Sequence, residues 1–122
     1  NYPVQLALSP AAAALAAGDR VMLKPSELTP RTSDLLREIV RAEFDENVFA
    51  VVTGGVEVGQ AFSSVPFDHL LYTGSTSVGQ KVYMAAAKNL TPVTLELGGK
   101  SPAIIDESAD VAAAALSIAH GK

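Results

Sequence analysis

A five-residue segment, Glu-Leu-Gly-Gly-Lys at residues 96–100, follows the apolar run 92–95. If that run is a buried strand, its end places Glu96 at the edge of a sheet in partly desolvated surroundings. Burial of a carboxyl group raises its pKa towards the range in which it serves as a general base. The two glycines allow a ligand or another backbone to approach closely. A surface or salt-bridged carboxylate is the alternative, so the role of Glu96 depends on its neighbours.

Three more polar or glycine-rich clusters follow apolar runs: Lys-Pro-Ser-Glu at 24–27, Thr-Gly-Gly at 53–55 and Thr-Gly-Ser-Thr at 73–76. Lys24 and Glu27 combine a donor with an acceptor, which suits the vicinal hydroxyls of a sugar. A solvated lysine and a first-turn glutamate are the alternative. The glycines at 54 and 55 let an adenine ring lie close to the backbone, or they form a plain turn.

Gly74 and Ser75 precede a predicted helix, where free N–H groups and the helix dipole attract an anion such as a pyrophosphate. The segment is not a Gly-x-Gly-x-x-Gly fingerprint, and a serine N-cap is the alternative. His69 and His120 are expected to be structural, because neither has another ligand residue at metal-binding spacing. No metal site is therefore expected.

Apolar runs that alternate with amphipathic segments predict the elements that hold these clusters. Strands are expected at residues 20–24, 47–53, 69–73, 93–97 and 103–105. Helices are expected at residues 4–17, from 30 or 31 with Thr29 as N-cap, at about 57–63 and 77–88, and at 110–120. This alternation predicts right-handed crossovers and one doubly wound parallel sheet in a single α/β domain spanning residues 1–122. The four clusters then meet at the carboxyl ends of the strands, where such domains bind ligands.

The composition is that of a globular domain, with 48% hydrophobic and 18% charged residues. A net charge of −4 and scattered basic residues argue against nucleic-acid binding. No apolar run reaches the ~18 residues of a membrane span. The absence of cysteine excludes disulfides, thiolate metal sites and a thiol nucleophile within these residues. Together the four clusters favour a nucleotide or dinucleotide site.

Three motifs in register resemble those of the NAD(P)-dependent aldehyde dehydrogenases. They are Lys-Pro-Ser-Glu at 24–27, Gly-Ser-Thr-x-x-Gly at 74–79 and Leu-Glu-Leu-Gly-Gly-Lys-Ser-Pro at 95–102. The resemblance covers the whole chain, and residues 67–74 and 89–96 are similar in particular to the class 3, fatty-aldehyde and coniferyl-aldehyde branch. It implies a Rossmann-like NAD(P)-binding domain and the cofactor NAD, with NADP possible. Glu27 beside the ribose 2′-hydroxyl would repel a 2′-phosphate, which favours NAD.

The resemblance also implies roles for single residues. Asn1 corresponds to the asparagine that stabilises the oxyanion, and Glu96 to the general base that activates the thiol or the hydrolytic water. The residues implied to bind the cofactor are Lys24, Ser26 and Glu27 around the adenosine ribose, Gly55, Gly59 and Val78 near the adenine, Gly74 and Ser75 at the pyrophosphate, and Leu97 and Gly98 at the nicotinamide.

The nucleophilic cysteine of the family lies beyond the position of Lys122. The chain is therefore expected to be a fragment that is inactive alone, without the catalytic-cysteine domain and the oligomerisation segment. The resemblance implies a small aldehyde substrate, a cytoplasmic location and a homodimer or tetramer for the complete protein. Two alternatives stay open: a nucleotide-binding module without catalysis, and a superfamily member that handles acyl-CoA or acyl phosphates. Such members often lack the Glu96 equivalent.

Overall fold

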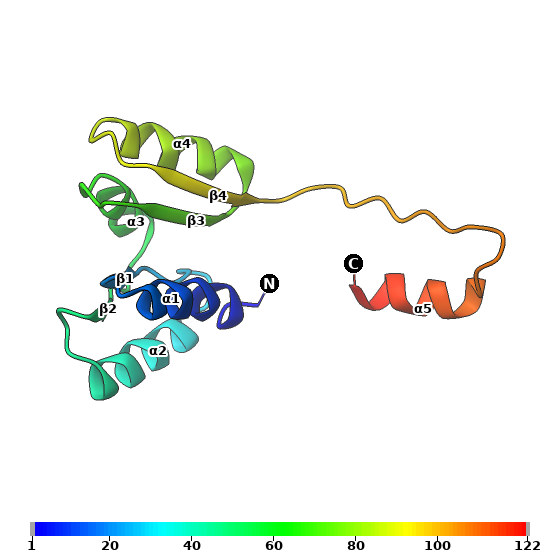
Figure 1. Ribbon diagram of the computed structural model, residues 1–122, viewed down its shortest axis with the longest axis horizontal. Coiled ribbons are helices and arrows are strands. Elements are labelled where there is room, and N and C mark those ends of the chain that lie inside the picture. The colour runs from blue at the N-terminus through cyan, green and yellow to red at the C-terminus, as the bar shows by residue number, and fades with distance from the viewer. Residues whose placement is uncertain (1, 122) are drawn as a thin grey trace.

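The computed structural model describes residues 2–121. Its helices are α1 (Gln5–Ala17), α2 (Pro30–Glu43), α3 (Val56–Ser63), α4 (Thr76–Ala87) and α5 (Val111–Gly121). Its strands are β1 (Val21–Leu23), β2 (Phe49–Val51), β3 (Leu70–Gly74) and β4 (Val93–Leu97). Helices and strands alternate along the chain, which confirms the predicted α/β class (Figure 1).

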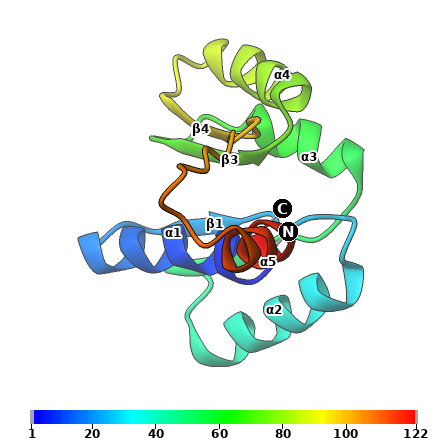
Figure 2. The ribbon, with the colours of Figure 1, turned by 90° about the vertical axis from the view of Figure 1, so that its right-hand side faces the viewer.

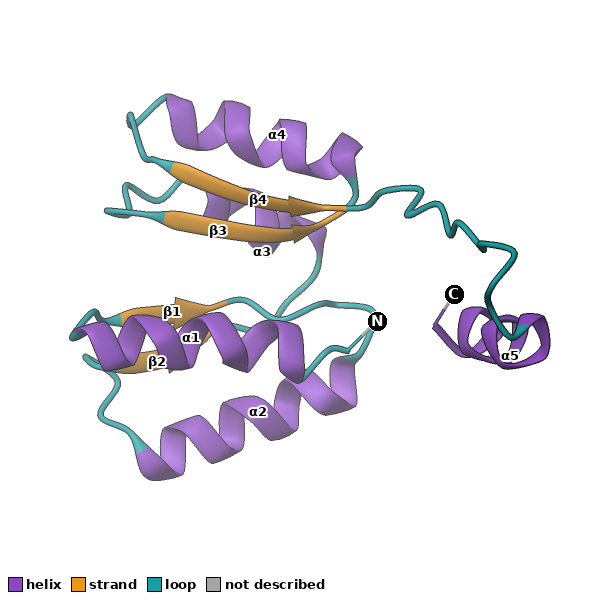
Figure 3. Ribbon diagram, turned by 45° about the vertical axis from the view of Figure 1, so that its right-hand side comes forward, coloured by secondary structure: helices purple, strands orange, loops and turns teal. Residues whose placement is uncertain are grey.

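The strands pair in two parallel ladders, β1 with β2 and β3 with β4. Parallel pairing was predicted and is confirmed, but the described strands form two two-stranded sheets rather than one continuous ladder. Figure 3 shows the β3–β4 pair above the β1–β2 pair, with a gap between β3 and β1. Because β1 and β2 are only three residues long, they offer few backbone groups to a further strand.

Each strand pair has its own small core. Helices α1 and α2 pack on β1 and β2, where Ala11, Val40 and Phe49 are buried together. Helix α4 packs on β3 and β4 around Leu70 and Val82, and α3 packs beside α4. The chain therefore has two packed bodies, and each brings its strand ends to the surface.

Gly18 ends α1 as the sequence predicts. Its φ of 94° lies in the left-handed region that favours glycine, and its N–H donates to Leu15 O while Asp19 N–H donates to Ala14 O. This turn returns the chain directly into β1 and so places Lys24 at the end of that strand.

The strand predicted at residues 103–105 is not formed. Residues 98–105 run as a loop away from β4, and α5 stands beyond it, apart from the strands (Figures 1 and 2). Ile104 is 91% exposed and no residue of α5 is buried. An apolar triplet becomes a strand only beside a partner with which it can pair, and within residues 2–121 none of the strands lies beside it.

Candidate functional site

The strands end on one side of the molecule, as the arrowheads in Figure 3 show. Lys24 follows β1, Thr53 lies just beyond β2, and Ser75 and Gly98 follow β3 and β4. The predicted clusters therefore share one edge, although they divide between the two strand pairs.

Lys24 and Glu27 form an ion pair at the end of β1. Lys24 Nζ donates to Glu27 Oε2 at 2.6 Å, and the Lys24 side chain is only 12% exposed. The hydrogen bond from Lys24 lowers the pKa of Glu27, and a backbone hydrogen bond adds to this effect. Glu27 is therefore held ionised beside a largely buried ammonium group, and Lys24 is not the solvated lysine of the alternative interpretation.

Two of the predicted glycines lie close to this ion pair. Gly55 occupies the N-cap position of α3, and a Cβ added at Gly59 would lie 3.9 Å from Lys24 Nζ. The start of α3 thus faces the end of β1, so that the loop after β1 and the turn after β2 come together.

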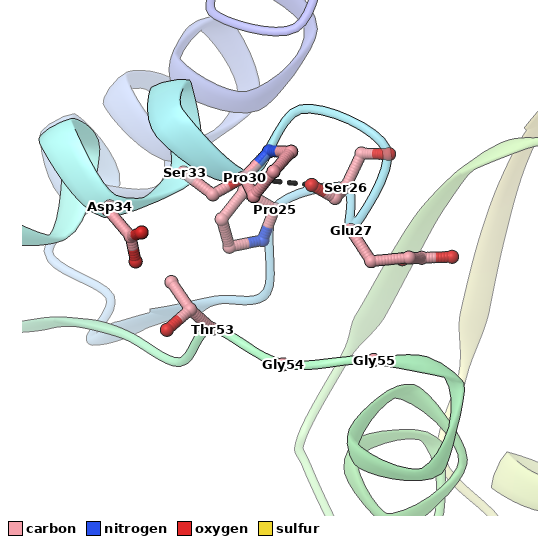
Figure 4. A pocket seen from close by; sticks show the side chains of 9 residues that line it. All are labelled: Pro25, Ser26, Glu27, Pro30, Ser33, Asp34, Thr53, Gly54 and Gly55. Carbon is pink, nitrogen blue, oxygen red and sulfur yellow. Dashed lines mark hydrogen bonds between the residues drawn. The ribbon is translucent and has the colours of Figure 1, made fainter.

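An open pocket of about 360 Å³ lies between these two loops (Figure 4). It is lined by Pro25, Ser26, Glu27, Pro30, Ser33, Asp34, Thr53, Gly54 and Gly55. Residues 25–27 and 53–55 belong to clusters predicted from the sequence, whereas Ser33 and Asp34 of α2 were not predicted. One feature of the sequence could have indicated Ser33, because this polar residue shares the buried, otherwise apolar face of α2 with Leu36 and Val40.

Ser75 is the N-cap of α4, which was the alternative interpretation of this segment. Its Oγ accepts the Val78 N–H at 3.4 Å. A Cβ at Gly79 would lie 2.8 Å from Leu97 Cδ2, so Gly79 permits close packing of α4 on β4. Thr29, by contrast, occupies the N-cap position of α2 without the predicted side-chain hydrogen bond.

Glu96 lies opposite Thr73 in the β3–β4 ladder and is exposed. The expectation of partly desolvated surroundings is wrong for the described residues, because β4 loses its cover towards its carboxyl end. Glu96 and Leu97 line a second open pocket of about 470 Å³ together with Leu6, Pro10, Leu71 and Thr73. Glu96 therefore faces α1 and stands apart from the pocket that Glu27 lines. Asn1, the predicted oxyanion ligand, lies outside the described residues.

Two kinds of feature are absent from residues 2–121. No group of His, Asp and Glu side chains gathers closely enough to hold a metal ion. No helix in this range has both the length and the apolar character needed to cross a membrane.

The sequence model of the aldehyde dehydrogenase family matches residues 1–122. The chain belongs to the aldehyde dehydrogenase family. It is 57% identical over 122 residues to a probable coniferyl aldehyde dehydrogenase of Caulobacter vibrioides, covering 100% of this chain and 25% of that protein. It is 49% identical to the rat dimeric NADP-preferring aldehyde dehydrogenase, covering 100% of this chain and 27% of that protein. The resemblance to the coniferyl-aldehyde and class 3 branch is thereby confirmed.

Solved structures agree with this aldehyde dehydrogenase assignment. The substrate-bound state of Staphylococcus aureus AldH matches with a TM-score of 0.92 and 46% identity over 98% of this chain and 26% of that chain. The Mycobacterium tuberculosis aldehyde dehydrogenase complexed with NAD⁺ matches with a TM-score of 0.80 and 48% identity over 92% of this chain and 24% of that chain. The chain thus spans about a quarter of the length of the relatives it matches.

Proposed function

We propose that this chain is the cofactor-binding part of a longer NAD(P)-dependent enzyme that oxidises an aldehyde to a carboxylic acid. The observation that carries the proposal is the Lys24–Glu27 ion pair at the carboxyl end of β1, in a member of the aldehyde dehydrogenase family. Ligands of parallel α/β folds bind at this edge of the strands.

The pocket beside the ion pair fits an adenosine ribose. Lys24 supplies N–H donors and the ionised Glu27 supplies an acceptor, which are the partners that sugar hydroxyls need. The glycines at 55 and 59 keep side chains away from this place, and Ser26 lies in the same wall. Because Glu27 carries a negative charge, a 2′-phosphate is repelled, so we expect NAD to be preferred and NADP to be accepted.

The second strand pair would hold the rest of the cofactor. The first turn of α4, with Gly74 and Ser75, offers backbone N–H groups to a pyrophosphate. Val78, 42% exposed on that turn, is assigned to the adenine, and Leu97 and Gly98 are assigned to the nicotinamide. When bound, the nicotinamide supplies a hydride acceptor.

Two residues of this chain are assigned to catalysis. Asn1 would donate its side-chain amide to the oxyanion, an interaction worth ~3 kcal/mol in comparable sites. Glu96 would take a proton from the thiol or from the water that releases the acid. Because the chain contains no cysteine, the nucleophile must come from another part of the protein.

The missing cysteine also favours a second candidate for the isolated chain, which is nucleotide binding without catalysis. Handling of acyl-CoA or acyl phosphates is disfavoured for the complete protein by the presence of Glu96. The complete protein is proposed to be a homodimer or a tetramer, and the name of the rat relative, which is called dimeric, supports the homodimer. A cytoplasmic location is part of the same proposal.

The test is NADH formation by the purified complete protein with coniferyl aldehyde and a series of aliphatic and aromatic aldehydes. We expect turnover with NAD, weaker turnover with NADP, and none by the 122-residue chain alone. Absence of turnover with every aldehyde and both cofactors would refute the proposed enzyme. NADH formation by the isolated chain would refute the need for an outside nucleophile.

A further inference from the structure

Helix α2 contacts both walls of the pocket through two residues on one face. Ser33 and Arg37 are four residues apart, so their side chains lie one above the other on the helix. Ser33 Oγ donates to Ser26 O at 2.9 Å, and Arg37 Nη1 donates to Thr53 Oγ1 at 3.0 Å. The first bond reaches the loop after β1, and the second reaches the turn after β2.

The two hydrogen bonds differ in how deeply their donor side chains are buried. Ser33 is 4% exposed, and its hydroxyl is a buried link between α2 and the loop that carries Glu27. The Arg37 side chain is about half exposed. Its guanidinium is also oriented by Asp34, with 3.4 Å between Arg37 Nη2 and Asp34 Oδ1. Figure 4 shows Ser33 and Asp34 at the helix side of the pocket, with Thr53 on the opposite wall.

The turn at residues 53–55, which Arg37 contacts, has a backbone with wide conformational freedom. Thr53 is followed by Gly54 and Gly55, and glycines have the widest backbone freedom. A wall that moves must be ordered when a ligand binds, and this ordering lowers affinity. A side chain that fixes Thr53 therefore holds the glycine wall in place before the ligand arrives.

We propose that Arg37 is a positioning residue for the adenosine half of the cofactor. Together with Ser33 it makes α2 a brace that sets the separation between the Ser26–Glu27 wall and the Thr53–Gly55 wall. The inference rests on the proposed cofactor site. Because the brace borders a different pocket from the one that Glu96 lines, we expect it to act on cofactor affinity and to leave the chemical step unchanged.

The experiment compares Arg37→Ala, Thr53→Val and the double variant in the complete protein. Loss of one hydrogen bond of this kind corresponds to about a 3–10-fold weakening. We expect each single variant to raise KM for NAD by that factor with kcat within about twofold, and the double variant to be no worse than either single one. Arg37→Lys should recover part of the affinity, because an ammonium also donates to Thr53 Oγ1. Arg41→Ala, an exposed arginine one turn further along α2, is the matched control.

Inhibition by partial ligands locates the effect. ADP-ribose contains the adenosine half, and nicotinamide mononucleotide lacks it. We expect Arg37→Ala to weaken competitive inhibition by ADP-ribose and to leave that by nicotinamide mononucleotide unchanged. Two results would contradict the positioning role of Arg37. One is a lower melting temperature of Arg37→Ala with an unchanged KM for NAD, and the other is a KM in the double variant that equals the sum of the two single effects in free energy. If Arg37→Ala fails to fold, Thr53→Val and Arg37→Lys decide through the same KM and inhibition measurements. Failure of the unsubstituted protein to bind NAD would instead remove the proposed function itself.

Discussion

The β1–β2 half and the β3–β4 half of the molecule end at the same edge, but they hold their polar residues differently. Lys24 and Glu27 are paired with each other beside a pocket whose walls are tied to α2. Glu96 is exposed, and the chain then leaves the packed body towards α5. We infer that the adenosine end of the proposed site is complete within these residues. The surroundings that a general base needs must come from contacts beyond them.

Replacing Glu96 is expected to have the largest effect and to separate the two halves by function. A positioned base contributes ~10²–10⁴-fold, so Glu96→Gln should lower kcat of the complete enzyme by that factor. The Kd of NAD should stay unchanged, because Glu96 is not assigned to cofactor binding and the Lys24–Glu27 pair that is assigned to the ribose lies in the other half. Steady-state kinetics and an equilibrium titration with NAD measure the two quantities. Glu107→Gln, an exposed carboxylate before α5, is the control. Retention of more than about a tenth of kcat would speak against the base.

Substitution of one glycine in each half tests how closely atoms pack around the backbone there. A Cβ at Gly54 would lie 2.8 Å from the Val58 Cβ, which cannot rotate away, whereas a Cβ at Gly98 meets no atom within 4 Å. Gly54→Ala should therefore lower the free energy of unfolding by about 1–3 kcal/mol, and Gly98→Ala by less than ~0.5 kcal/mol. Urea denaturation of the complete protein gives both values. Equal losses would show that the two halves are equally packed.

The sequence predicts the regular elements well and the contacts between them poorly. The Gly18 stop follows from a local rule, because a left-handed glycine needs no distant partner. The apolar, β-rich run at Val93–Leu97 predicts a strand, and the strand forms because β3 lies beside it as a partner. The strand predicted at 103–105 is not formed, because it needs a neighbouring strand to pair with and the described residues do not provide one. The exposure of Glu96 likewise depends on tertiary cover, and the Arg37–Thr53 bond joins residues 16 positions apart that no local motif connects.

The preference for NAD over NADP tests the role of the Glu27 charge in the β1–β2 half. Removing the negative charge beside the ribose 2′-position should favour a 2′-phosphate by about 1 kcal/mol, which is roughly a fivefold gain. Glu27→Gln is therefore expected to raise kcat/KM for NADP relative to NAD in the complete enzyme, with little change in Tm. Glu38→Gln on α2, an exposed carboxylate away from the pocket lining, is the control. An unchanged ratio would contradict the placement of Glu27 at the ribose.

The smallest expected effect is the pH dependence of the Lys24–Glu27 pair. Lys24 lowers the folded pKa of Glu27 below its ordinary value of 4.5, so folding is stabilised by the ionised form. That contribution is present above the unfolded pKa and is lost as the pH falls through the folded pKa. Because the Glu27 side chain is 41% exposed, solvent screening limits the pair to less than ~0.5 kcal/mol. The difference in unfolding free energy between the unsubstituted protein and Glu27→Gln should therefore be small at pH 7 and vanish once the pH has fallen below the folded pKa of Glu27. A difference that grows on acidification would mean that the pair destabilises the fold and is retained for its role at the pocket.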